Sequence, residues 1–135
     1  MSVTFGKAIT VPASDPAKKI MKTLVNRNLF GKLQDVWALG ASLGIAHGQV
    51  YEEGKRETFQ NINSLDSEGV FAAIMIGLYP EMSAEERFKK WVNHAEWGIR
   101  EIWRKEENGT LDFSSLIQSN DKSAARESSP RNSDE

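Results

Sequence analysis

The chain has 135 residues, no cysteine, 39% hydrophobic residues and a formal net charge of −2. The lack of cysteine excludes disulfides, thiolate metal sites and a cysteine nucleophile, and it fits a reducing compartment. The first ten residues lack the cationic start and long apolar core of a signal peptide, and no run of about 18 apolar residues could span a membrane. We therefore expect a cytoplasmic protein that has no membrane segment.

The charge is distributed unevenly along the chain. Residues 1–34 contain six basic and one acidic side chain, and the remainder contains 11 basic and 18 acidic side chains. A basic first quarter on an acidic body favours an anionic partner at that end. A lysine-rich helix face that is simply solvated would give the same pattern.

The first predicted elements are a strand and a helix. Apolar residues alternate with polar or small ones from Val3 to Val11, which predicts a strand that ends at Pro12. Ser14 or Asp15 can then cap a helix that ends near Asn28.

A second helix is predicted from Leu33 to Gly48. Apolar residues lie on nearly all of its sides, so we expect it at the centre of the fold. Gly40 and Gly44 share one of its faces, and each glycine inside a helix costs about 1 kcal/mol relative to alanine. A close backbone contact would offset this cost. The neighbour would be another helix of the chain or the same helix of a second subunit, so both glycines are candidate homodimer contacts.

The middle of the chain predicts a polar connection followed by a third helix. Residues 49–65 are mostly polar, and Thr58–Ile62 is compatible with a short strand. Asp66 is expected to cap a helix that continues through Leu78 and stops before Pro80. Because residues 70–79 are almost all apolar, we expect this helix to be buried on all sides.

A fourth helix has the clearest start signal, since Ser83 and Glu86 form a capping box, and it should end near Asn108. After Gln118 no apolar residue larger than alanine occurs, which predicts a disordered polar tail over residues 119–135. The expected fold is mainly α: a short N-terminal strand and a compact four-helix domain over residues 1–118, followed by this tail.

Catalytic chemistry has no recognisable signature in the sequence. His47 and His94 have neither zinc-ligand spacing nor a serine at a motif-like distance, and no glycine-rich phosphate loop is present. We therefore expect no catalytic residues, no metal site, no cofactor and no enzymatic activity.

Trp97 falls opposite the apolar side of the fourth helix, among charged residues. An exposed tryptophan often marks a partner surface, here with Lys90 and Arg104 beside it. Alternatively, the segment around Phe113 covers it.

The order strand, basic helix, glycine turn and helix resembles a ribbon-helix-helix module, in which strands of two subunits pair to enter the major groove. In that arrangement the N-terminus of the second helix holds a phosphate. The candidate groove-facing residues are Thr4, Lys7 and Thr10, and the candidate phosphate contacts are Lys18, Lys19, Lys22, Arg27 and Lys32.

Three stretches together resemble the small accessory proteins encoded beside bacterial and archaeal DNA phosphorothioation (Dnd) genes. They are Leu29–Gly44, the basic loop Gly54–Arg56 and His94–Ile102. The resemblance implies a role in a DNA-modification or anti-phage defence locus and implies no catalytic residues.

We therefore expect a non-enzymatic accessory or regulatory protein that binds DNA, or a DNA-modification or restriction protein, through residues 1–34. The alternative is a protein-interaction adaptor with no DNA contact, and a third option is a small toxin or enzyme of unknown type.

Overall fold

The computed structural model describes residues 4–112, which form two strands and five helices. In chain order these are β1 (Thr10–Ser14), α1 (Asp15–Asn26), α2 (Leu33–His47), β2 (Arg56–Asn61), α3 (Ile62–Leu65), α4 (Val70–Leu78) and α5 (Ala84–Glu107). The mainly helical class is confirmed, with five helices instead of four because α3 adds a single turn. The predicted tail, residues 119–135, and the predicted domain end at 118 lie outside the described residues.

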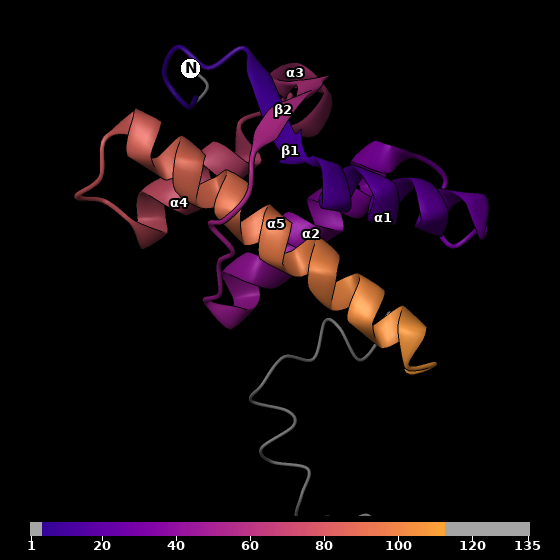
Figure 1. Cartoon of the computed structure of the whole chain (residues 1–135). Coiled ribbons are helices and arrows are strands. Elements are labelled where there is room, and N and C mark those ends of the chain that lie inside the picture. Colours follow the sequence, from indigo (N-terminus) through magenta and orange to yellow (C-terminus); the bar gives the residue numbers. More distant parts are fainter. Residues whose placement is uncertain (1–3, 113–135) are drawn as a thin grey trace, which may run out of the picture.

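The long helix α5 is the centre of the fold and contacts α1, α2, α4 and β1. It runs diagonally across the molecule in Figure 1, with α2 behind it and α4 near its N-terminal half. The predicted capping box is present, because Ser83 Oγ accepts the Glu86 amide and Glu86 accepts the Ser83 amide. The helix ends at Glu107 with Asn108 as its C-cap, close to the predicted end. Within residues 4–112, no helix is long and apolar enough to cross a membrane.

The core lies mainly between α5 and α2, whose predicted bounds are confirmed within a residue. Gly48 ends α2 in the left-handed conformation, with φ of 64°. The fully buried rings of Trp37 and Trp91 meet edge to face with centroids 4.7 Å apart, and Phe5 stacks on Trp91 at 4.5 Å. The N-terminal residues before β1 therefore contribute to the core through this one aromatic side chain.

The predicted N-terminal strand is displaced along the chain. β1 covers Thr10–Ser14 and contains Pro12, whereas the alternation had placed the strand over Val3–Val11 with proline ending it. β1 pairs antiparallel with β2 of the same chain, and the register shifts between Val11 and Pro12. Proline cannot donate to a ladder, so an irregularity here accommodates it. A ribbon-helix-helix ribbon, by contrast, is paired between two subunits.

The prediction that α4 is buried on all sides is wrong. Ala72 and Met75 are buried against the core, but Val70, Ile74 and Leu78 are 57%, 41% and 50% exposed. The start of the helix is also later than predicted. Asp66 does cap it, but from four residues away, by accepting the amides of Phe71 and Ala72 through both carboxylate oxygens.

Candidate nucleic-acid interface

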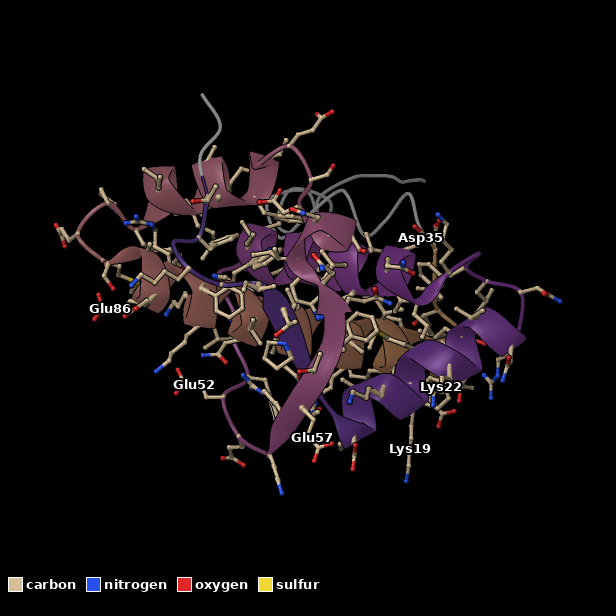
Figure 2. The ribbon with its side chains drawn as sticks, turned by 90° about the horizontal axis from the view of Figure 1, so that it is seen from above. Lys19, Lys22, Asp35, Glu52, Glu57 and Glu86 are labelled. Carbon is tan, nitrogen blue, oxygen red and sulfur yellow. The ribbon has the colours of Figure 1, made fainter. Side chains whose placement is uncertain are left out.

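Helix α1 carries most of the predicted phosphate contacts on its outer side. Ser14 Oγ caps the helix at the Ala17 amide, and burial of Ala17, Met21 and Leu24 fixes which side faces solvent. Lys19 and Lys22 are therefore exposed one turn apart, as Figure 2 shows. Neither has an ion pair or a side-chain hydrogen bond to the rest of residues 4–112.

Two of the predicted contacts are instead engaged within the chain. Lys18 Nζ donates to the Thr58 carbonyl at 3.3 Å, which ties α1 to β2. Arg27 pairs with Glu106 at 2.9 Å, and its guanidinium lies 5.1 Å from the Trp103 ring centroid. These side chains connect α1 to β2 and to the C-terminal half of α5, so a phosphate would compete with existing contacts.

The start of α2 supplies one more exposed cation. Lys32 occupies the N-cap position, and no side chain caps the helix there. The first amides of a helix carry partial positive charge and favour anions. Asp35, exposed in the first turn, opposes an anion at this end. We call Lys19, Lys22 and Lys32 the α1–α2 basic surface, a name for the exposed lysines of these two consecutive elements.

Thr4 and Lys7 do not belong to this surface. Both are exposed on the segment before β1, away from α1. Thr4 lines a groove of about 300 Å³ beside Asn61 and Asp66, and Lys7 lines one of about 550 Å³ beside Glu85 and Glu86. The predicted nucleic-acid residues are thus divided between two regions, and carboxylates accompany the N-terminal pair.

The glycines Gly40 and Gly44 contact another helix of the same chain. A Cβ on Gly44 would lie 2.2 Å from the His94 carbonyl oxygen, and one on Gly40 would lie 2.9 Å from the Ile99 amide nitrogen. Gly98 completes the crossing, since its Cβ would lie 1.7 Å from the Gly40 carbonyl oxygen. Of the two neighbours left open by the sequence, the structure shows a helix of the same chain, so the assignment of these glycines to a dimer contact was wrong.

Trp97 is half-buried and lies against α2. Its ring centroid is 5.5 Å from that of His47, so α2 provides cover that the sequence did not predict, while Phe113 lies outside the described residues. Lys90 lies 5.3 Å from the Tyr79 ring centroid, and Arg104 is exposed and bonds Glu101 at 2.6 Å. The three predicted partner-binding residues line one side of α5, but each contacts a residue of the chain itself.

A buried carboxylate that the sequence did not single out joins β1 to α5. Glu96 is fully buried and accepts the Ser14 amide at 2.9 Å and the Ser14 hydroxyl at 2.8 Å. Arg100 pairs with it at 2.7 Å and stacks 3.8 Å above the Tyr51 ring. Arg56 Nε lies 3.9 Å from the same carboxylate. The sequence shows only the four-residue spacing of Glu96 and Arg100. The contact with Ser14 was not predictable, because Ser14 is 82 residues away in the chain.

His94 is the other buried polar group of α5. Its Nδ1 lies 2.7 Å from the Gln49 carbonyl, and its Nε2 lies 2.9 Å from the Tyr79 hydroxyl. A carbonyl can only accept, so Nδ1 carries the proton and Nε2 accepts from Tyr79. Burial lowers the pKa of His94 and raises the pKa of Tyr79, which keeps both side chains neutral near neutral pH.

This arrangement predicts that the protein loses stability in weak acid. The lowered pKa of His94 means that the folded state binds fewer protons than the unfolded state, so stability falls as pH drops below the ordinary value of 6.5. We expect a slope of up to about 1.4 kcal/mol per pH unit until the folded pKa is reached. Urea unfolding from pH 7.5 to 5 measures it.

His94→Gln is the matched variant, because glutamine does not titrate. Its slope over the same range should be clearly shallower than that of the parent. An unchanged slope would assign the effect to other groups. Glu101, whose pKa is lowered chiefly by its hydrogen bond to Arg104, contributes separately and only at lower pH, since its stabilisation is lost as pH falls below about 4.5.

Within residues 4–112, no three histidine, aspartate or glutamate side chains come together as a group that could hold a metal ion. The buried side chains of Glu96 and His94 are hydrogen-bonded to Ser14, Arg100, Tyr79 and the Gln49 carbonyl, an arrangement that joins elements of the fold. No family model, curated protein or solved structure matches the chain. The α1–α2 basic surface is thus the candidate site that the sequence predictions and the geometry share.

Proposed function

We propose that this protein is a non-enzymatic accessory protein that binds DNA through the α1–α2 basic surface. The observation that carries the proposal is that Lys19, Lys22 and Lys32 are exposed and have no ion-pair or hydrogen-bond partner for their side chains within residues 4–112. Flexible ammonium groups of this kind neutralise phosphates without reading sequence.

Helix α1, the turn after it and α2 follow in the same order as the two helices of a ribbon-helix-helix module. The uncapped N-terminus of α2 would accept a backbone phosphate, with Lys32 beside it. The resemblance to Dnd-associated accessory proteins implies the setting, which is a DNA-modification or defence system. Position on the duplex would then be set by a larger DNA-acting partner, because three lysines carry no base readout.

Charge reversal at the basic surface tests the proposal. We expect the double variant K19E/K22E to bind a labelled 20-base-pair duplex at least about ten-fold more weakly than the parent at low salt, because two phosphate contacts become repulsive. Fluorescence anisotropy measures the change. The exposed Lys89 of α5 provides the matched control, since Lys89→Glu and Lys22→Glu alter the net charge equally.

Lys22→Glu should therefore weaken binding more than Lys89→Glu. Equal losses at the two positions would mean that the duplex responds to net charge rather than to this surface. No binding by the parent would favour the alternative, an adaptor without DNA contact, and that alternative draws on a different part of the fold.

A further inference from the structure

Helix α4 presents an apolar side that nothing in residues 4–112 covers. Val70, Ile74 and Leu78 follow one another at four-residue spacing and are 57%, 41% and 50% exposed. Ala73 and Gly77 lie between them on the same side of the helix, and a Cβ on Gly77 would meet nothing within 4 Å. We call these five residues the α4 face.

Another exposed apolar side chain lines a groove next to the start of α4. Ile9, on the segment before β1, is 69% exposed and lines the groove of about 300 Å³ that also includes Gly69, the residue that precedes α4. Contiguous exposed apolar surface of this kind commonly marks an interaction site. In helix-in-groove recognition, a helix contacts its partner through residues three or four positions apart, which is the spacing seen here.

The charges around the α4 face restrict what can cover it. Carboxylates flank the helix in sequence, and two cations of α5 lie at its C-terminal end, where Arg87 donates to the Tyr79 carbonyl and Lys90 lies 5.3 Å from the Tyr79 ring centroid. Glu68 precedes α4 and Glu81 follows it, and both are exposed. In a symmetric pair of α4 helices, whether parallel or antiparallel, these carboxylates would approach like charges, which disfavours a second copy.

The chain's own C-terminal segment starts from the wrong place to cover this face. The Phe71 and Trp91 rings are 5.3 Å apart and those of Tyr79 and His94 are 5.9 Å apart, so α4 packs on the N-terminal half of α5. Helix α5 is about 36 Å long at 1.5 Å per residue, and in the sequence residue 113 comes after its other end. The apolar residues larger than alanine beyond 112 are Phe113, Leu116 and Ile117, and a five-residue span reaches only about 17 Å.

We propose that the α4 face docks a helix of a partner protein that carries an apolar stripe flanked by lysine or arginine. The stripe would pack on Val70, Ile74 and Leu78. The backbones of the two helices could approach closely at Ala73 and Gly77, whose side chains are small or absent. The basic flanks would complement Glu68 and Glu81. This surface is separate from the α1–α2 basic surface, so the protein can bind DNA and such a partner at the same time.

Synthetic helices test the proposal on the full chain. The probe is an 18-residue amphipathic peptide with a leucine stripe and lysines on its polar side, and the comparison is the same peptide with glutamates. We expect the lysine peptide to bind, and the double variant I74S/L78S to weaken it at least ten-fold while leaving duplex DNA binding unchanged. Ile76→Ser, at the edge of the exposed side of α4 and 37% exposed, should weaken binding less than I74S/L78S does. Circular dichroism checks that each variant is folded.

Three outcomes would overturn the proposal. Equal binding of the lysine peptide to the parent and to I74S/L78S, or no binding to either, removes the α4 face as its docking site. Equal binding of the glutamate peptide removes the charge argument. A parent dimer in sedimentation that I74S/L78S converts to a monomer identifies a second copy of the chain as the occupant.

Discussion

We expect Gly98→Ala to lower the free energy of unfolding by about 3 kcal/mol or more, even though alanine is the better helix former. The added Cβ would lie 1.7 Å from the Gly40 carbonyl oxygen, which is backbone and cannot rotate away. Helices α2 and α5 would have to separate at the centre of the core. Urea unfolding measures the loss, and the melting temperature should fall on the order of 10 °C.

Gly77→Ala is the matched control for this prediction. Gly77 is also inside a helix, but its Cβ would enter open space, so alanine should stabilise the isolated chain by about 0.5–1 kcal/mol. The same substitution is thus expected to have opposite signs at the two positions. If Gly98→Ala were neutral or stabilising, the close crossing of α2 and α5 would be wrong.

We expect Glu96→Gln to lower the free energy of unfolding by about 3–5 kcal/mol, the usual cost of removing one partner from a buried ion pair. The carboxylate is fully buried and binds Ser14 through two hydrogen bonds and Arg100 through an ion pair. The amide would leave the half-buried guanidiniums of Arg56 and Arg100 without their anion. Chemical denaturation monitored by tryptophan fluorescence measures the change.

Glu101→Gln provides the comparison on the same helix. Glu101 pairs with Arg104 three residues later at 2.6 Å, but the arginine side chain is 58% exposed. Exposed pairs contribute about 0.2–1 kcal/mol, so this variant should be nearly as stable as the parent. Similar losses for the two variants would show that burial of Glu96 does not set its contribution.

The helix boundaries were largely predictable because their signals are local. Ser14 and the Ser83–Glu86 capping box mark the starts of α1 and α5, and Gly48 marks the end of α2. Each signal depends on residues within one or two turns, so no tertiary information is needed to interpret it. The strand β1 was misplaced because its pairing with β2, about 45 residues later, decided which residues entered the ladder.

Burial and pairing across the chain were not predictable in the same way. The apolar run of α4 has no periodicity that separates a fully buried helix from one with an exposed side. Likewise, the spacing of Glu96 and Arg100 predicts at most a surface ion pair. Only the fold brings Ser14 to that carboxylate.

The charge of residues 1–34 indicated which part of the chain is basic, but it did not indicate which of the basic side chains are unpaired. Lysines 19, 22 and 32 are exposed as the basic first quarter predicted, whereas Lys18 and Arg27 contact β2 and α5. Such contacts depend on which element packs beside each side chain, and the charge of a segment does not contain this information.

The most direct test of the proposed function is the affinity of the purified chain for a labelled duplex across a salt series. Binding through three lysines predicts a slope near −2.7 for log K against log salt, from about 0.9 per phosphate. A slope of that size that becomes shallower in K19E/K22E would support the α1–α2 basic surface. Absence of binding at low salt, or binding that salt does not weaken, would contradict it.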